Sequence, residues 1–217
     1  MIIDKNMKSN FFKRLLSAII FIPLIIIPII IEGYILVFIY LTLLTLIVLE
    51  LINITYEYNF NLYGFIYIFI SVFSLFTFII LIISSDSNIQ FILTILMIWL
   101  FDTFSYLGGS LFKGKKIFPK ISKGKTYSGL ISGYVSLIIF YFIYKIFFID
   151  LHSISISYIF LIATLAFIGD FNISFIKRLS LIKDSGTIMP GHGGLLDRMD
   201  SFIFVFFIIG AFELIRV

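Results

Sequence analysis

Long apolar runs separated by short polar segments dominate the chain. A bilayer core of about 30 Å needs about 20 apolar residues per spanning helix. Seven runs of that length can be read, at about 12–31, 33–52, 62–84, 88–109, 128–149, 155–174 and 200–217. Pro23 and Pro28 would kink the first helix, which is tolerated where neighbouring helices satisfy the freed carbonyl groups. The pattern predicts an all-α, polytopic integral membrane protein with about seven transmembrane helices.

The composition supports the same class. Of 217 residues, 61% are hydrophobic and 13% are charged, with 28 Phe and 12 Tyr. A water-soluble globule could not bury so much apolar surface, and disordered chains are poor in such residues, so both classes are excluded. The chain has no Cys, which excludes disulfides and thiolate chemistry. The first apolar run is too long for a cleaved signal peptide and continues into a second run.

All but two of the 16 Lys and Arg residues fall into three segments of the chain. They are Lys5, Lys8, Lys13 and Arg14, then Lys113, Lys115, Lys116, Lys120, Lys123 and Lys125, then Lys177, Arg178, Lys183 and Arg198. With seven spans, all three segments lie on the side that the positive-inside rule assigns to the cytoplasm. The opposite loops carry Glu32, Asp86 and Asp150 and no basic residue. We expect one membrane-embedded domain over 1–217, with a cytoplasmic N-terminus and cytoplasmic loops at about 110–127 and 175–199.

Two acidic residues, Asp102 and Asp170, lie inside apolar runs. An Asp in the middle of a membrane helix costs about 2.5–3.5 kcal/mol on insertion scales. Either both face the headgroups from helix ends, or they form a metal or proton site inside the bundle. Each precedes a basic loop, which favours the second interpretation. Glu50 and Lys145 lie near the ends of their runs, where snorkelling of the side chain to the interface explains them.

The residues that follow Asp170 share one face of a helix. Asp170, Ser174, Lys177 and Arg178 are spaced i, i+4, i+7 and i+8. This face could hold a metal at its apolar end and a phosphate at its basic end. A solvated helix end would also carry the Lys-Arg pair.

The densest polar segment runs over 183–201. Its charged and imidazole side chains are Lys183, Asp184, His192, Asp197, Arg198 and Asp200. Glycines at 186, 191, 193 and 194 let a backbone approach a ligand closely, and amides running into the last helix would form an anion cradle. Carboxylates together with phosphate oxygens are what Mg²⁺ uses, while Arg and Lys bind phosphates. His192 could be a general acid or base, a hydrogen-bond donor to phosphate, or a loop residue that hydrogen-bonds within the protein.

The earlier basic loop contains Lys123-Gly124-Lys125-Thr126, which invites a P-loop interpretation. That interpretation fails, because Pro119 stands where the pattern needs a glycine. The basic residues alone would suit anionic headgroups.

The chain resembles the phosphatidate cytidylyltransferase (CDP-diglyceride synthetase) family. The family's C-terminal signature reads here as Ser174, Lys177-Arg178, Lys183-Asp184, Gly186, Pro190, His192-Gly193-Gly194, Asp197-Arg198 and Asp200. The upstream segment agrees, with Trp99, Asp102-Thr103, Tyr106, Gly109, Phe112, Pro119, Ser122, Lys125-Thr126, Gly129 and Gly133. The catalytic segments are about 99–133 and 169–201. Departures are Ser128 and Ile173, where members often have Glu, and Lys113-Gly114, which reverses the usual Gly-Lys.

The resemblance implies transfer of CMP from CTP to phosphatidic acid, giving CDP-diacylglycerol and pyrophosphate in phospholipid biosynthesis. Its implied catalytic residues are Lys183, Asp184, His192, Asp197, Arg198 and Asp200. The residues implied to bind substrate phosphates are Lys125, Thr126, Ser174, Lys177, Arg178, Gly193 and Gly194. The implied metal ligands are Asp102, Asp170, Asp184 and Asp197, with Mg²⁺ as cofactor and a second cation such as K⁺ left open. Because the attacking phosphate is already an anion, His192 is not needed as a strong base.

The resemblance also implies a multi-pass protein of the bacterial cell (inner) membrane. Its active site would face the cytoplasm, its substrates would be CTP and phosphatidic acid, and it would form a homodimer and bind no nucleic acid. Two alternatives stay open. A CTP-dependent lipid-alcohol kinase would transfer the γ-phosphoryl group instead, and a transporter would use Asp102 and Asp170 as ion relays.

Overall fold

The computed structural model of the protein describes residues 20–57, 62–84, 88–147, 154–186, 188 and 193–216. After a helical segment over Ile20–Ile31 come α2 (Gly33–Glu57), α3 (Leu62–Ser84), α4 (Ile89–Phe112), β1 (Lys116–Phe118), β2 (Ser122–Thr126), α5 (Tyr127–Phe147), α6 (Ile156–Leu179) and α7 (Leu196–Arg216). The expected runs and the observed helices agree closely. Two helices are longer than expected: α2 continues to Glu57 and α6 to Leu179, and the longer α6 keeps the stripe that begins at Asp170 on one helix.

Five of the described helices, α2 to α6, are long and apolar enough to cross a membrane. The described part of the first expected span, Ile20–Ile31, is shorter. Helix α7 has 21 residues but carries Asp197, Arg198 and Asp200 near its start and Glu213 near its end. Asp197 and Arg198 precede the apolar run that the sequence predicts over 200–217, while Asp200 and Glu213 lie within it. The structure therefore supports a multi-pass helical membrane protein, with five of the seven expected spans meeting the criteria of length and composition.

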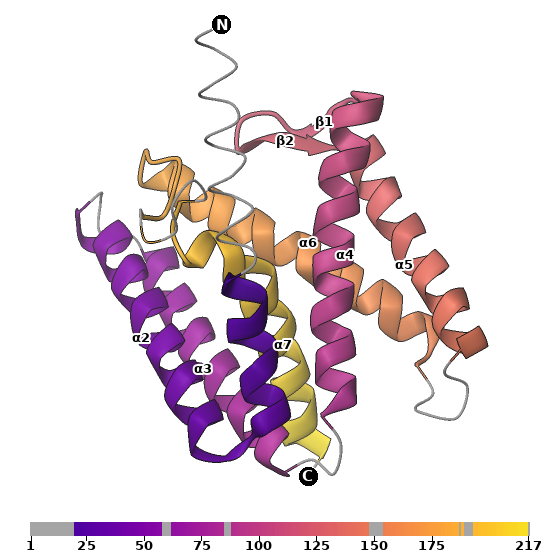
Figure 1. Ribbon diagram of the computed structural model, residues 1–217. Coiled ribbons are helices and arrows are strands. Elements are labelled where there is room, and N and C mark those ends of the chain that lie inside the picture. Colours follow the sequence, from indigo (N-terminus) through magenta and orange to yellow (C-terminus); the bar gives the residue numbers. More distant parts are fainter. Residues whose placement is uncertain are drawn as a thin grey trace, which may run out of the picture.

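Successive helices run in alternating directions between two ends of the molecule (Figure 1). The β1–β2 hairpin, the turn after α6 and the start of α7 lie at one end, which is uppermost in Figure 1. The connection between the first helical segment and α2 and the end of α7 lie at the other end. The two segments that the sequence marks as chemically rich therefore meet at one end.

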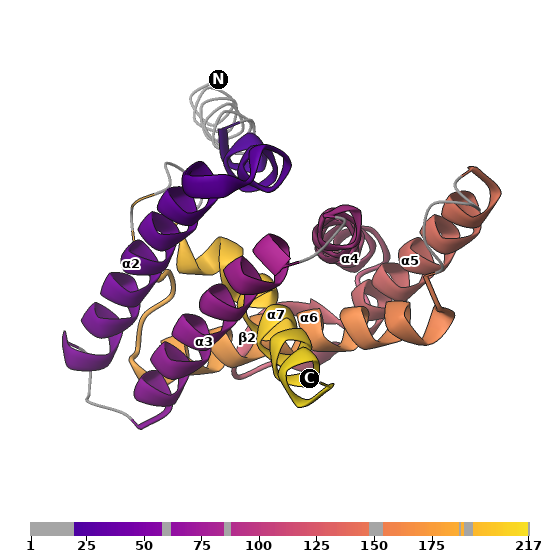
Figure 2. The same ribbon diagram turned by 90° about the horizontal axis from the view of Figure 1, so that it is seen from below.

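The helices form two groups that α6 joins. Helices α2, α3 and α7 pack together, α4 packs along α5, and α6 contacts both groups (Figure 2). The ring of Phe78 on α3 lies at the centre of the first group, with its centroid 5.0 Å from Tyr40, 5.1 Å from Phe202 and 4.4 Å from Phe206. This aromatic core fixes α7, and with it the polar start of that helix.

Helices α4 and α5 approach each other through small residues. A Cβ added at Gly108 would lie 2.0 Å from the Ser132 hydroxyl, and one at Gly129 would lie 2.5 Å from the Ser105 carbonyl oxygen. Small residues of this kind let membrane helices pack at close range. The close contact holds the second half of α4, which carries Asp102, against the start of α5.

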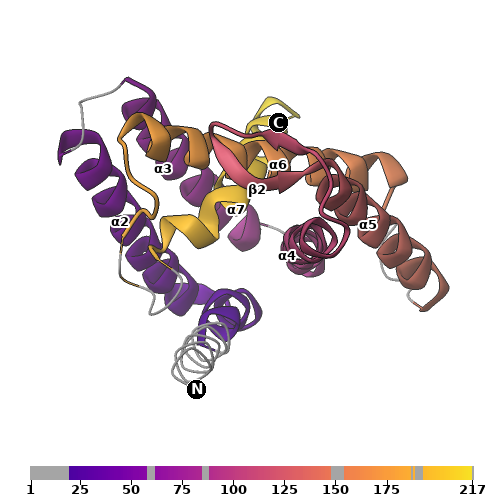
Figure 3. The same cartoon turned by 90° about the horizontal axis from the view of Figure 1, so that it is seen from above.

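A two-stranded antiparallel hairpin fills the first basic loop, which the sequence predicted only as a loop. Lys116 pairs with Thr126, and Phe118 pairs with Ser122. The Phe118 ring lies 4.4 Å from the Phe171 ring of α6, centroid to centroid. Seen from this end, the hairpin lies across α6, beside α4 and α5 (Figure 3). The hairpin therefore brings Lys125 to α6, while Thr126 lies against Gly129 at the start of α5.

Candidate active site

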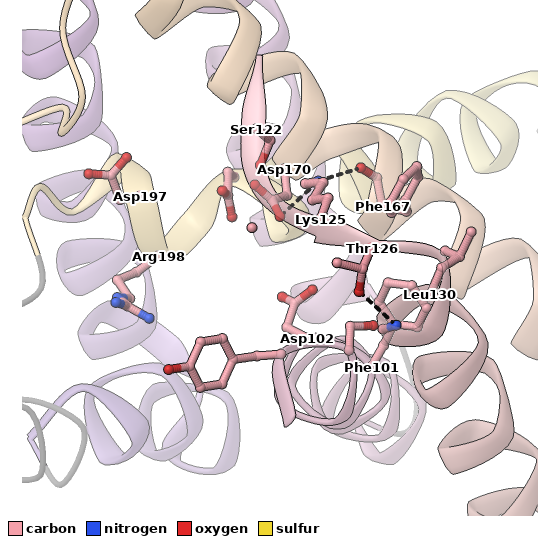
Figure 4. Close-up of a pocket in the computed structure, with 15 residues that line it drawn as sticks. Phe101, Asp102, Ser122, Lys125, Thr126, Leu130, Phe167, Asp170, Asp197 and Arg198 are labelled. Carbon is pink, nitrogen blue, oxygen red and sulfur yellow. Dashed lines mark hydrogen bonds and ion pairs between the residues drawn. The ribbon is translucent and has the colours of Figure 1, made fainter. Parts of the chain in front are cut away.

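A pocket of about 290 Å³ opens where the hairpin meets α4, α6 and α7. Seven of the residues proposed from the sequence line it: Asp102, Lys125, Thr126, Asp170, Asp197, Arg198 and Asp200. They come from four separate elements, and Figure 4 shows several of them around the same space. Apolar residues, including Phe101, Leu130 and Phe167, line the same pocket. Charged and apolar groups thus face one cavity.

Carboxylates from three helices face this pocket. Asp102 lies on α4, Asp170 on α6, and Asp197 and Asp200 on α7. Asp102, Asp170 and Asp200 are close enough to interact electrostatically. The Ser201 hydroxyl lies 3.5 Å from an Asp102 oxygen, so α7 also contacts α4 at this point. Asp102 and Asp170, the acids that are expensive to bury in a membrane, therefore line one pocket, and the metal or proton site expected there stays a prediction.

Gly169 lets α6 and α7 cross closely beside these acids. A Cβ at Gly169 would lie 2.7 Å from the Asp200 carbonyl oxygen and 3.0 Å from the Ser201 Cα. The crossing brings Asp170, the next residue on α6, close to Asp200 on α7. Gly169 is thus required by packing and not by backbone conformation.

Two lysines pair with acids of the pocket. The Lys125 ammonium lies 2.8 Å from an Asp170 oxygen, donates to the Phe167 carbonyl oxygen at 3.3 Å, and lies 4.6 Å from the Phe167 ring centroid. The Lys177 ammonium donates to Asp197 Oδ1 at 2.5 Å. Both lysine side chains are largely buried. Positive charge is therefore held beside the carboxylates before any substrate phosphate arrives.

Thr126 lines the pocket and also begins a helix. Its hydroxyl accepts a hydrogen bond from the Gly129 N–H at 3.1 Å, which caps α5. Ser128, one of the departures from the family pattern, accepts from the Gly114 N–H at 3.1 Å and so ties the end of α4 to the start of α5. These two contacts therefore fix the start of α5 beside the pocket.

Several proposed site residues lie outside the pocket lining. Ser174 is buried and donates to Asp170 Oδ1 at 3.3 Å. Arg178 donates to the carbonyl oxygens of Ile121 and Ile182, so it links the hairpin to the turn after α6. The phosphate-binding role expected of both residues stays a prediction.

Ser185 and Gly194, described residues of the glycine-rich loop at 183–195, contact Asp197. Lys183 and Asp184 are exposed, and a Cβ at Gly193, whose φ is +91°, would lie 2.8 Å from Asp197 Oδ2. The Gly194 N–H donates to that same oxygen at 3.3 Å. This amide is thus engaged by a carboxylate, and the phosphate cradle expected at Gly193 and Gly194 stays a prediction. His192 lies outside the described residues.

The sequence interpretation of Glu50 is wrong. Snorkelling would place its carboxylate in water, but the residue is only 4% exposed. It accepts hydrogen bonds from the N–H groups of Leu195 and Leu196, both at 2.9 Å. Glu50 lies closer to the end of its apolar run than Asp102 does, and this position misled the interpretation. The signal that could have identified Glu50 is the one that identified Asp102, namely a carboxylate inside an apolar run.

Tyr67 was not considered from the sequence. It is a buried residue of α3, and its hydroxyl donates to the Asp200 carbonyl oxygen at 3.4 Å. Ile173, which replaces a frequent Glu of the family, is fully buried in the apolar core. The side chain at this position therefore adds no ligand to the pocket.

The donor chemistry of the pocket fits a hard divalent cation. No three carboxylates of the described residues are grouped closely enough to hold an ion by themselves. Magnesium usually takes one or two carboxylates and completes its shell with water and substrate phosphates. The pocket offers such carboxylates beside Lys125 and Arg198, which suit phosphate. The arrangement is suited to chemistry on a phosphate ester at the edge of an apolar bundle.

Comparisons with known proteins agree with this chemistry. Residues 5–215 match the model of the cytidylyltransferase family. The chain is 39% identical over 219 residues to a phosphatidate cytidylyltransferase of Rickettsia prowazekii, covering 94% of both chains. It is 35% identical over 212 residues to that of Rickettsia conorii, covering 93% of this chain and 90% of the relative. A phosphatidate cytidylyltransferase of Thermotoga maritima is 36% identical over 121 residues, 52% of this chain and 45% of the relative.

Proposed function

The chain belongs to the cytidylyltransferase family, and on that premise we propose that it is an enzyme that transfers CMP from CTP to phosphatidic acid. The products are CDP-diacylglycerol and pyrophosphate, and the reaction belongs to phospholipid biosynthesis. The observation that carries the proposal is the pocket itself. There, carboxylates of α4, α6 and α7 meet Lys125 and Arg198 beside apolar side chains.

The reaction is a displacement at phosphorus. A phosphate oxygen of phosphatidic acid attacks the α-phosphorus of CTP, the new P–O bond forms, and the bond to the bridging oxygen of pyrophosphate breaks. Pyrophosphate leaves with that electron pair. Since the attacking oxygen is already anionic, no side chain has to remove a proton. Catalysis then consists mainly of positioning the two phosphates and neutralising their charge.

The cationic side chains of the site supply that neutralisation. Lys125 and Arg198 line the pocket and bind the phosphates of the two substrates. Arg198 suits a bidentate contact with phosphate oxygens, while Lys125 acts as a point charge. Lys177, held on Asp197, adds a third positive charge at the start of α7. Together these groups offset the repulsion between two anionic substrates.

Magnesium is the cofactor of this proposal. One or two of Asp170, Asp197 and Asp102 would hold it together with water and substrate phosphates, and Asp200 faces the same cavity. When bound, the ion neutralises charge on the CTP phosphates and on the leaving pyrophosphate. The proposal also includes a second cation such as K⁺, and Asp184, which is exposed, as a further metal ligand.

The pocket suits a substrate that is half lipid and half anion. Phe101, Leu130 and Phe167 form an apolar wall beside the charged groups. Acyl chains would stay in the bilayer while the headgroup reaches CTP from the water. The basic residues at this end of the bundle favour a cytoplasmic orientation in the bacterial inner membrane. A homodimer is part of the proposal, and cross-linking in native membranes tests it.

Purified protein in mixed micelles with Mg²⁺, phosphatidic acid and α-labelled CTP tests the function. Label in the lipid phase with release of pyrophosphate is the expected result. Label in water as CDP would instead indicate a lipid kinase, and no turnover of CTP would favour a transporter. Protein carrying Asp170→Asn, prepared in the same way, is the matched control for contaminating activity.

A further inference from the structure

Glu50 binds the glycine-rich loop from a different part of the chain. It lies on α2, more than a hundred residues before the loop in sequence. Its Oε1 accepts from the Leu195 N–H and its Oε2 from the Leu196 N–H, each at 2.9 Å. The Ser185 hydroxyl donates to Oε2 at 3.1 Å. Two donors from the loop and one from the first residue of α7 therefore converge on one buried carboxylate.

This carboxylate acts as an N-cap of α7 supplied by another helix. The first backbone N–H groups of a helix have no partner inside that helix. At α7, which begins at Leu196, the N–H of that residue and the N–H of Leu195 just before it both point to Glu50. The positive end of the helix dipole also favours a negative charge at this position. The contact therefore gives the carboxyl group of Glu50 hydrogen-bond partners at 4% exposure.

Two glycines of the loop make room for Glu50. A Cβ at Gly194 would lie 2.4 Å from Glu50 Oε2, and a Cβ at Gly186 would lie 2.9 Å from Oε1. Any larger residue at Gly194 would displace the carboxylate from the loop amides. These two glycines thus serve a contact inside the protein, apart from any contact with a substrate phosphate.

The same loop orients Asp197 in the pocket. The Ser185 N–H donates to Asp197 Oδ2 at 2.9 Å, while its hydroxyl donates to Glu50. Asp197 Oδ1 accepts from Lys177. Ser185 is therefore fixed between a buried carboxylate outside the pocket and a carboxylate that lines it.

We infer that Glu50 is a positioning residue: it fixes the start of α7 and the glycine-rich loop so that Asp197 and Arg198 face the substrate pocket. The expected effect on kinetics rests on the proposed function. The structural link from Glu50 through Ser185 to Asp197 is independent of that function. Glu50 itself is absent from the pocket lining.

Kinetics of Glu50→Gln test the inference. Glutamine keeps the shape of the side chain, but its NH₂ group is a donor and cannot accept a hydrogen bond from a backbone N–H. We expect the KM for CTP to rise about 10- to 100-fold, as for outer residues that orient ligand-binding side chains. The KM for phosphatidic acid should change less than about 2-fold. A purely structural defect would lower the active fraction and leave both KM values unchanged. Asn53→Ala, at an exposed position one turn further along α2, is the matched control and should behave as wild type.

Hydrogen exchange of the full-length protein in micelles gives a readout independent of activity. Exchange at 185 and 194–196 should accelerate in Glu50→Gln, while exchange in α4 and α5 stays unchanged. Wild-type kinetics together with wild-type exchange in this variant would overturn the inference. If Glu50→Gln does not fold, Ser185→Ala replaces it: a raised KM for CTP supports the link and wild-type values overturn it. A wild-type protein without CMP transfer would instead contradict the proposed function, and the exchange result alone would then decide the inference.

Discussion

The Lys125 ammonium lies 2.8 Å from the Asp170 carboxylate, and this ion pair joins the hairpin to α6 inside the pocket. A second pair, between Lys177 and Asp197, joins α6 to the start of α7. Each lysine holds a carboxylate that the proposed function assigns to cation binding. The positive charges therefore balance the acids of the site across element boundaries. Substrate phosphates and a divalent cation would compete for these same groups.

Lys125→Met is expected to lower kcat/KM for CMP transfer by about 100-fold, the usual cost of losing a group that stabilises transition-state charge. Methionine keeps much of the length of the side chain but carries no charge beside Asp170. The measurement is initial rate against CTP concentration in micelles. Lys120→Met, at an exposed position between the two strands, is the matched control. Equal rates for the two variants would argue against a role for Lys125 in binding phosphate.

Asp197→Asn should abolish turnover while the protein remains folded. The amide keeps an oxygen that can accept from the loop, but it removes the negative charge that faces Lys177. Label transfer from CTP and the thermal unfolding midpoint are measured on the same preparation. Glu213→Gln, which removes a carboxylate near the other end of α7, serves as control. Substantial remaining transfer would refute the assignment of Asp197 to the reaction.

Gly169→Ala should destabilise the protein by about 1–3 kcal/mol, the usual cost of overpacking. Its Cβ would meet the Asp200 carbonyl oxygen at 2.7 Å and force α6 away from α7. Thermal unfolding in micelles measures the effect. Gly124→Ala is the matched control for stability, since a Cβ there meets nothing within 4 Å. The packing argument fails if both variants unfold at the wild-type temperature.

The helices could be predicted from the sequence because membrane spans are set by length and hydropathy. The stripe from Asp170 to Lys177 was also predictable, because helical spacing alone places these residues on one face. Two acids of the pocket, Asp102 and Asp170, stood out as charges inside apolar runs. These features depend on residues close together in the chain.

The remaining features depend on contacts between distant segments. The hairpin has few apolar residues, and its position over α6 is set by Phe118 against Phe171. Glu50 caps α7 across 145 positions of sequence or more. The glycines at 186 and 194 looked like a phosphate cradle because nothing local shows that a carboxylate of α2 occupies the space between them. Local sequence patterns do not predict such contacts between residues that are far apart in the chain.

Leu181→Gly is expected to stabilise the protein, by relieving backbone strain where α6 ends. Leu181 has φ of +59° and is 86% exposed, so it takes a left-handed conformation with little burial in return. The N–H groups of Leu181 and Ile182 donate to the Arg178 and Lys177 carbonyl oxygens, which is the Schellman arrangement that favours glycine at this position.

The left-handed conformation costs an ordinary residue about 1–2 kcal/mol, and part of the gain from Leu181→Gly is offset by the greater freedom of glycine in the unfolded chain. We expect a net gain of about 0.5–1 kcal/mol, which for a chain of this size raises the unfolding midpoint by about 1–4 °C. Leu181→Ala is the control, because alanine shortens the side chain but keeps the Cβ that disfavours this φ. Equal midpoints for the Gly and Ala variants would show that the end of α6 stores no such strain.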